Sequence, residues 1–174
     1  MRRRHLSAVL FAVPVVANAL TPVTHEQQFC NSSHVVQARV LHADVTPTLC
    51  GFGLATRPCC SGELVVTVTD VLGIRKAVAS YPEDLGISTG KDVRLSVRRY
   101  LYPQKPTRAT CAEDQSSLLR KEFLFSVHTN SGAWAEGMTQ VSKPPYPAVI
   151  WPDRKWVEQV LRASDGSRCP ERVK

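Results

Sequence analysis

Ser88 lies in Gly86-Ile87-Ser88-Thr89-Gly90, which matches the G-x-S-x-G pattern of serine hydrolases. In those enzymes the serine lies on a strained turn between a strand and a helix, above a parallel sheet. Here the following segment alternates like a strand, and a chain of 174 residues is short for that architecture. We therefore expect the two glycines to flank an ordinary hairpin or loop, and we do not expect an enzyme.

His25 begins a second partial motif, His25-Glu26-Gln27-Gln28-Phe29, which starts like the H-E-x-x-H helix of zinc proteases. That helix needs two histidines one turn apart to bind the metal from one face, and Phe29 replaces the second. The other histidines are scattered singly along the chain, at His34, His42 and His128. We expect them to have packing or surface roles, with no metal or cofactor site in this chain.

The six cysteines do not form a redox or zinc motif, because the adjacent pair Cys59-Cys60 lacks the C-x-x-C spacing. In an exported protein an even number of cysteines predicts disulfides, here three. Adjacent cysteines rarely pair with each other, because the geometry is strained. Asn31-Ser32-Ser33 is an N-glycosylation acceptor pattern, and export would give it weight.

Residues 1–19 have the features of a secretion signal. A basic leader, 1–5, precedes the apolar run 6–16 and the small-residue cleavage site Ala17-Asn18-Ala19. The apolar run is well short of the ~20 residues that a membrane-spanning helix needs. We expect a secreted, extracellular protein that begins at Leu20, with cleavage after Ala17 left open, and no interaction with a membrane.

The net charge is mild once the leader is removed. Without its three arginines the 22 basic residues become 19, against 15 acidic ones, so the charge falls from +7 to +4. This is too small to predict nucleic-acid binding. Five basic residues, Arg94, Arg98, Arg99, Lys105 and Arg108, form either a sulfated-glycan site or a solvated strand face.

Alternation with a period of two dominates the middle of the chain and predicts half-buried antiparallel strands. The expected strands are 36–40, 64–71, 93–98, 122–128 and 137–141. Segments 46–62 and 103–110 are expected to be irregular, and the prolines of 143–147 to end the strand region. After Pro152-Asp153, one amphipathic helix presents Trp156, Val157, Val160 and Leu161 on one face, and Gly166 ends it. The mature chain, 20–174, is expected to form one domain.

The segment Gln27-Gln28-Phe29-Cys30-Asn31, followed by Val35-Val36-Gln37-Ala38-Arg39-Val40, resembles the start of the tissue inhibitors of metalloproteinases. That family has a Q-x-F-C-N-type motif and a V-x-R-A-K/R-V strand. The resemblance continues through 62–73, 91–97, 110–111, 121–127, 151–152 and 166–169, without the family's separate C-terminal domain. It implies a mainly β fold, the netrin-like module: an OB-type five-stranded barrel flanked by helices, here with a C-terminal helix and disulfide support.

The family inhibits zinc proteinases by inserting its N-terminus into the active-site cleft, where the amine and carbonyl of a first cysteine chelate the catalytic zinc. The resemblance implies that Leu20 chelates the target's zinc and that Thr21 fills the adjoining pocket, followed by Pro22 and Val23. The segment Ala109-Thr110-Cys111 corresponds to a neighbouring loop that supports the N-terminus. The implied partner is an extracellular zinc metalloproteinase, and we expect a monomer.

The family has Cys-Thr-Cys-Val where this chain has Leu20-Thr21-Pro22-Val23, so no disulfide joins the N-terminus to the barrel. The resemblance implies a Cys30–Cys169 bridge. Cys111 has lost its family partner, and we expect it to pair with Cys50, Cys59 or Cys60, while the other two close a local bridge. One such arrangement is Cys50–Cys60 with Cys59–Cys111.

Two functions remain open. The first is a secreted metalloproteinase inhibitor, which Thr21 in register favours. The second is a netrin-like binding module for an extracellular protein or a sulfated glycan, favoured by the absence of the N-terminal cysteines and of the C-terminal domain.

Overall fold

A computed structural model describes residues 29–51, 56–75, 85–101, 105–128, 143–162 and, for the backbone alone, 172–173. The protein is mainly β. Its elements are β1 (His34–Cys50), β2 (Arg57–Arg75), β3 (Asp92–Arg99), α3 (Arg108–Leu118), β4 (Glu122–Val127), β5 (Tyr146–Trp151), α4 (Arg154–Arg162) and β6 (Arg172–Val173). The predicted signal peptide, the strand at 137–141, Gly166 and Cys169 lie outside the described residues.

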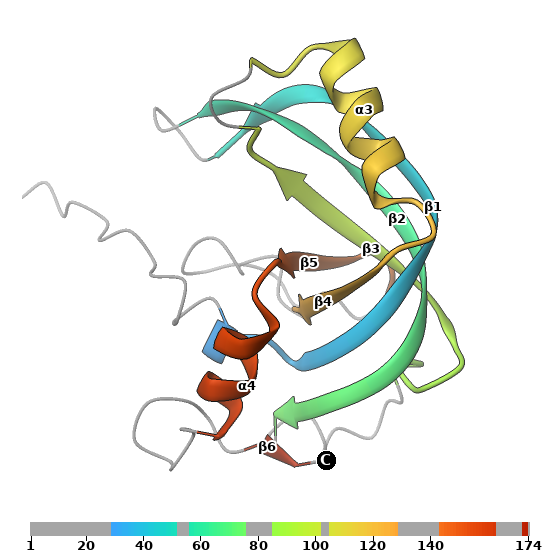
Figure 1. Ribbon diagram of the computed structural model, residues 1–174, viewed down its shortest axis with the longest axis vertical. Coiled ribbons are helices and arrows are strands. Elements are labelled where there is room, and N and C mark those ends of the chain that lie inside the picture. Colours follow the sequence, from blue (N-terminus) through green and yellow to red (C-terminus); the bar gives the residue numbers. More distant parts are fainter. Residues whose placement is uncertain are drawn as a thin grey trace, which may run out of the picture.

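Five strands close into a ring in the order β1-β2-β3-β5-β4, with β4 returning to β1. Every neighbouring pair is antiparallel except β3 and β5, which are parallel. The short β6 adds to the end of β2. Figure 1 shows β1 and β2 as long, strongly curved strands along one side of the molecule.

Alternate residues of the strands fill the interior of the ring, as the period-two pattern predicts. Val36, Ala38 and Val40 of β1 are at most 1% exposed. They belong to one hydrophobic cluster with the interior residues of the other strands, including Leu64, Val66, Val68, Val93, Leu95, Val97, Phe125, Val127, Tyr146 and Ala148. The strands predicted at 36–40, 64–71 and 93–98 are thus confirmed within β1 to β3, and the one predicted at 122–128 is β4, which ends one residue earlier.

A glycine permits the close contact between β1 and β2. Gly62 lies opposite Val45, and a Cβ atom built on it would be 1.8 Å from the backbone oxygen of Asp44. Backbone cannot move away from such a contact as the end of a flexible side chain can. Only glycine fits here, because it has no Cβ.

The segment 46–62 is not the long irregular loop that its Pro, Gly and Thr content predicted. Residues 46–50 continue β1 and pair antiparallel with 57–61 of β2, forming an extended hairpin. Thr46 and Thr48 are β-branched, a residue type that strands accommodate well, and Pro47 is exposed. The Pro, Gly and Thr content therefore did not indicate a strand here, because the strand forms through pairing between 46–50 and 57–61.

The prediction that prolines end the strand region at 143–147 is also wrong, because β5 begins at Tyr146 and contains Pro147. Pro147 has no N–H to donate, yet its carbonyl accepts a hydrogen bond from the His128 backbone N–H at 2.8 Å. A single missing donor does not prevent a strand from forming next to β3 and β4.

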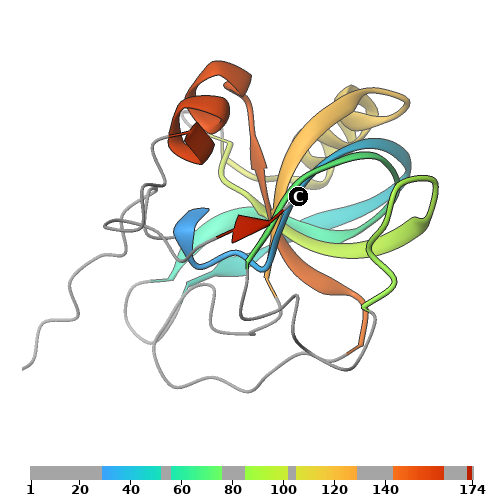
Figure 2. The ribbon, with the colours of Figure 1, turned by 90° about the horizontal axis from the view of Figure 1, so that it is seen from below.

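The amphipathic helix predicted after Pro152-Asp153 is α4. The carboxylate of Asp153 caps it by accepting hydrogen bonds from the backbone N–H groups of Lys155 and Trp156, at 2.9 and 3.2 Å. Its buried Val157 forms a second cluster with Phe29, Val35, Leu124 and Trp151, and Trp156, Val160 and Leu161 of the same helix face pack against that cluster. Val35 and Val36 belong to different clusters, so α4 covers the outside of the ring, as Figure 2 shows.

Among the described residues, no helix combines the length and the hydropathy needed to cross a membrane.

Candidate functional site

The predicted N-terminal contact residues, Leu20, Thr21, Pro22 and Val23, lie outside the described residues. Two parts of the candidate site are described: Ala109, Thr110 and Cys111, and the residues from Phe29 onward, where the N-terminal segment joins the ring.

Residues 109–111 do not form a supporting loop, because they lie in the first turn of α3. Thr107 caps this helix: its Oγ1 accepts a hydrogen bond from the Thr110 N–H at 3.2 Å, and Thr110 Oγ1 accepts one from the Thr107 N–H at 2.8 Å. Two N–H groups that the helix would leave unpaired are therefore satisfied. This reciprocal capping starts the helix where an irregular stretch was expected.

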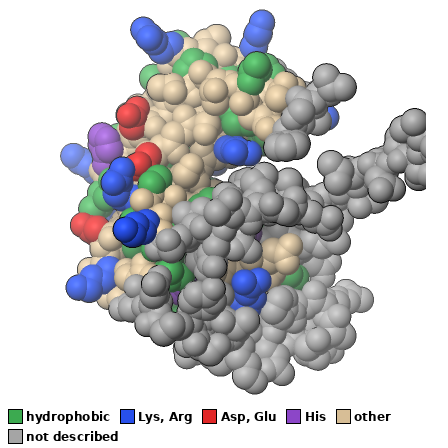
Figure 3. All heavy atoms as spheres, turned by 180° about the vertical axis from the view of Figure 1, so that it is seen from behind, with side chains coloured by type: hydrophobic (Ala, Val, Ile, Leu, Met, Phe, Trp, Pro, Cys, Tyr) green, Lys and Arg blue, Asp and Glu red, His purple; other side chains and the backbone are tan. Residues whose placement is uncertain are grey.

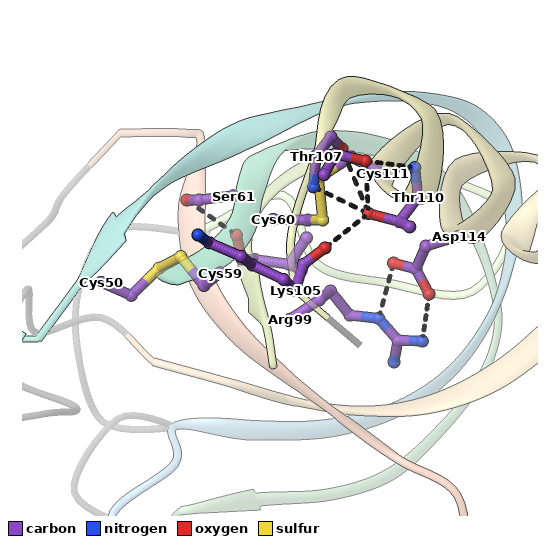
Figure 4. The surroundings of a disulfide bond; sticks show 11 residues. Cys50, Cys59, Cys60, Ser61, Arg99, Lys105, Thr107, Thr110, Cys111 and Asp114 are labelled. Carbon is purple, nitrogen blue, oxygen red and sulfur yellow. Dashed lines mark hydrogen bonds and ion pairs between the residues drawn. A yellow bond between two sulfur atoms is a disulfide. The ribbon is translucent and has the colours of Figure 1, made fainter. Parts of the chain in front are cut away.

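A disulfide joins α3 to the ring. Cys60 of β2 is bonded to Cys111, and Cys50 of β1 is bonded to Cys59 (Figure 4). The expectation that Cys111 pairs with one of the three hairpin cysteines is confirmed. The specific arrangement Cys50–Cys60 with Cys59–Cys111 is wrong, because successive strand residues point to opposite faces. Cys59 therefore faces the neighbouring strand's Cys50, while Cys60 faces the helix.

An ion pair makes a further connection between α3 and the ring. The Arg99 guanidinium in β3 donates two hydrogen bonds to the Asp114 carboxylate, 3.0 Å from Nε and 2.7 Å from Nη2 (Figure 4). The Asp114 side chain is only 7% exposed, so the pair is shielded from water on the carboxylate side. With Cys60–Cys111, it fixes α3 firmly against β2 and β3.

Residues 29–33, which we call the N-terminal anchor, hold the start of the described chain to the ring. The Phe29 carbonyl accepts hydrogen bonds from the Ser32 N–H and hydroxyl, at 3.1 and 2.6 Å. Ser33 donates from both its N–H and its hydroxyl to the Val127 carbonyl, at 2.7 and 2.9 Å. Cys30 is disulfide-bonded, and its predicted partner, Cys169, lies outside the described residues.

The predicted glycosylation site lies in this anchor. Asn31 is exposed, whereas Ser32 and Ser33 are fully buried. The asparagine can therefore carry a bulky glycan without disturbing the core.

The two parts of the candidate site lie at different ends of the ring. Figure 1 shows α3 at one end and α4 at the other, and Phe29 of the anchor contacts Trp156 of α4. Among the described residues, then, Ala109–Cys111 and the N-terminal anchor do not form one continuous surface.

Two of the five basic residues considered for a sulfated glycan are paired with carboxylates. Arg94 donates two hydrogen bonds to Glu63, at 2.5 and 2.8 Å, and Arg99 is paired with Asp114. Hydrogen bonding from Arg94 holds the pKa of Glu63 below its usual value of 4.5. Figure 3 shows Lys and Arg side chains scattered over one face among acidic and histidine side chains.

The structure also places the serine and two of the histidines that the other motifs singled out, whereas His25 lies outside the described residues. Ser88 is exposed between Gly86 (φ 68°) and Gly90 (φ 80°), and β3 follows, so the serine is not on a strand-to-helix elbow. His34 and His128 are buried. Within the described ranges, no three His, Cys, Asp or Glu side chains lie close enough together to hold a metal ion.

Three site features were missed from the sequence: the Thr107 cap, the Arg99–Asp114 pair and the contacts of Phe29 with Trp151 and Trp156. The spacing Thr107-x-x-Thr110 signals a helix start. The Arg99–Asp114 pair and the Phe29 contacts join residues that are distant in sequence, so no short sequence pattern predicts them.

The comparison with known proteins found no matching family model, curated protein or solved structure.

Proposed function

We propose that this protein is a secreted inhibitor of zinc metalloendopeptidases that acts through its N-terminal residues, on an OB-type barrel of the netrin-like kind. The five-stranded ring flanked by helices supports the barrel. The resemblance of 27–40 to the tissue inhibitors of metalloproteinases supports the family.

The observation that carries the proposal is the N-terminal anchor. An inhibitor of this kind must present a short, free N-terminus from a rigid body. Here the chain from Phe29 to Ser33 is held by hydrogen bonds to the ring and by a disulfide at Cys30. Leu20 precedes Phe29 by nine residues, which span at most about 30 Å when extended. The α-amine of a chain that begins at Leu20 can therefore be no more than about 30 Å from Phe29.

In the proposed mechanism the neutral α-amine of Leu20 would replace the water on the target's zinc, and the Leu20 carbonyl oxygen would bind as a fifth ligand. An α-amine titrates near pH 8 when unperturbed, and zinc binding favours its deprotonated form. Thr21 enters the adjoining pocket. Because no disulfide joins Leu20 or Pro22 to the barrel, residues 20–24 lose about 1–2 kcal/mol of backbone entropy each if they are ordered on binding.

The alternative is a netrin-like binding module for another extracellular protein or a sulfated glycan. Within the described ranges, three large apolar side chains are exposed: Leu41 (49%), Leu49 (67%) and Tyr100 (53%). Single exposed apolar residues are common on protein surfaces, so their exposure supports a binding module less strongly than the N-terminal anchor supports an inhibitor.

The test is inhibition by the secreted protein after N-terminal sequencing has shown which residue carries the free amine. It is titrated against a panel of zinc endopeptidases, alongside Thr21→Arg and a variant with one alanine added after Lys174. We expect inhibition of at least one enzyme, weakened by Thr21→Arg and unchanged by the C-terminal alanine. A protein that begins at Leu20 and inhibits none of them would favour the binding module.

A further inference from the structure

The end of the β1–β2 hairpin carries an exposed apolar strip. In the register of this hairpin Pro47 lies opposite Cys60, and Leu49 lies opposite Pro58. Opposed residues of an antiparallel pair have their side chains on the same face, as do residues two apart in one strand. Cys60 is fully buried, but the other three residues on this face are exposed, Leu49 by 67%. We call Pro47, Leu49 and Pro58 the hairpin strip.

The hairpin strip continues the hydrophobic interior of the ring. Val45, two residues before Pro47, is only 5% exposed and belongs with Cys60 to the first hydrophobic cluster. The apolar face of the hairpin therefore extends beyond the part that the core covers. A single exposed apolar residue needs no explanation, but neighbouring ones on one face form a patch typical of an interaction site. The prolines offer no backbone N–H, so a partner would meet side chains here.

The start of α3 lies beside the same face of the hairpin. Cys60, whose side chain is on this face, is bonded to Cys111 near the start of α3. The adjacent Thr110 donates a hydrogen bond from Oγ1 to the Lys105 carbonyl at 3.3 Å. Figure 1 shows the hairpin end and the segment leading into α3 at the same end of the molecule. The hairpin strip and residues 105–111 therefore border one surface.

This surface is basic. Lys105 and Arg108 are exposed, and among the described residues neither forms an ion pair. Arg57, in β2, adds a third exposed cation at the end of the hairpin. The first turn of α3 contains no acidic residue, and a helix N-terminus carries a partial positive charge of its own. The local potential therefore favours a negatively charged partner.

We propose that the hairpin strip and the adjoining basic residues dock an acidic, extended segment of a partner protein. Apolar side chains of that segment cover Leu49, and its carboxylates meet Lys105 and Arg108. The apolar strip favours a protein segment over a sulfated glycan, which would supply the negative charge without apolar side chains. The surface lies at the α3 end of the ring, whereas the N-terminal anchor lies at the α4 end. The inference therefore does not depend on the proposed inhibitory function.

The test begins with a phage-displayed library of random dodecapeptides, selected on the full secreted protein. We expect the selected peptides to combine acidic with large apolar residues. Labelled copies of these peptides are then titrated with the protein, and fluorescence anisotropy gives the Kd. Leu49→Ser should weaken binding at least about tenfold, because it removes the main apolar contact. Lys105→Glu with Arg108→Glu should do the same by repulsion, and binding should weaken in high salt.

Two variants serve as matched controls. Leu41→Ser changes a leucine of the same strand that is 49% exposed but lies outside the hairpin strip. Lys121→Glu reverses an exposed charge beyond the other end of α3. Both should leave the Kd unchanged within about twofold. Substitutions at exposed positions usually alter stability little, and circular dichroism with the unfolding midpoint verifies the fold of every variant.

Three results would overturn the proposal. The first is a selection that yields no binding peptide, or peptides without acidic residues. The second is a Kd that Leu49→Ser changes no more than Leu41→Ser does. The third comes from a heparin-derived octasaccharide: if it binds, and if binding is lost on reversing Lys105 and Arg108 but kept in Leu49→Ser, while no peptide depends on Leu49, the surface is a glycan site.

Discussion

The carboxylate of Asp114 in α3 accepts both hydrogen bonds of the Arg99 guanidinium in β3 and is almost completely buried against it. This pair and the Cys60–Cys111 bridge hold α3, which carries Ala109 and Thr110, against the ring.

Asp114→Ala should lower the free energy of unfolding by on the order of 2 kcal/mol, because it removes two charge-assisted hydrogen bonds and leaves Arg99 without its partner. Urea unfolding measures the change. Glu113→Ala, at the exposed neighbouring position, is the control and should change stability little. Equal effects of the two substitutions would show that the pair does not stabilise the fold.

Gly62→Ala should destabilise the protein by about 1–3 kcal/mol, the usual cost of overpacking, because its Cβ would meet the Asp44 backbone. Thr48→Ala, at an exposed position of the same hairpin, provides a control and should change stability little. Thermal unfolding compares the two variants. If Gly62→Ala is as stable as the wild type, β1 and β2 do not approach as closely as described.

The two described disulfides should differ in their contribution to stability. Cys60 and Cys111 are 51 residues apart and Cys50 and Cys59 only nine. Loop-closure entropy gives about 4 kcal/mol for the longer loop and about 2.5 kcal/mol for the shorter one. We expect Cys60→Ser/Cys111→Ser to lower the unfolding midpoint in urea more than Cys50→Ser/Cys59→Ser. The reverse order would contradict the pairing.

The Glu63–Arg94 pair predicts a pH effect. Because Arg94 lowers the pKa of Glu63 in the folded protein, the pair stabilises the fold above the ordinary pKa of 4.5 and loses this effect as the pH falls through the lowered pKa. Both side chains are substantially exposed, so the effect should be small and weaker in high salt.

NMR titration of the Glu63 carboxyl carbon tests this directly. Arg94→Ala should raise the pKa of Glu63 towards 4.5. The pKa of Glu122, which Gln37 and Arg39 lower, should not change. A Glu63 pKa that is the same with and without Arg94 would show that the ion pair is absent in solution.

Strands with regular alternation were predictable from sequence because burial on one face imposes that pattern. Val93-Arg94-Leu95-Ser96-Val97-Arg98 and the helix face of Trp156, Val157, Val160 and Leu161 are two such cases. The helix α3 was not predictable in this way. It buries Cys111, Asp114 and Leu118, and the partners of the first two, Cys60 and Arg99, are distant in sequence. The choice among Cys50, Cys59 and Cys60 was missed because it depends on the register of the hairpin, in which Thr48 lies opposite Cys59.

The sequence motif predicted where the candidate site lies along the chain, but not the residues that contact it. Gln27-Gln28-Phe29-Cys30-Asn31 marks the N-terminal anchor, but the partners of Phe29, Trp151 and Trp156, come from the far end of the chain. The roles of Leu20 to Val23 stay a prediction.

The most direct test of the central claim is the inhibition constant of the protein with a single alanine added before Leu20. The additional residue displaces the α-amine from the zinc without changing the fold, which circular dichroism and the unfolding midpoint can verify. We predict a loss of at least about 100-fold, equivalent to about 2.7 kcal/mol of binding free energy. If the extended protein inhibits as well as the one that begins at Leu20, zinc chelation by the N-terminus is wrong.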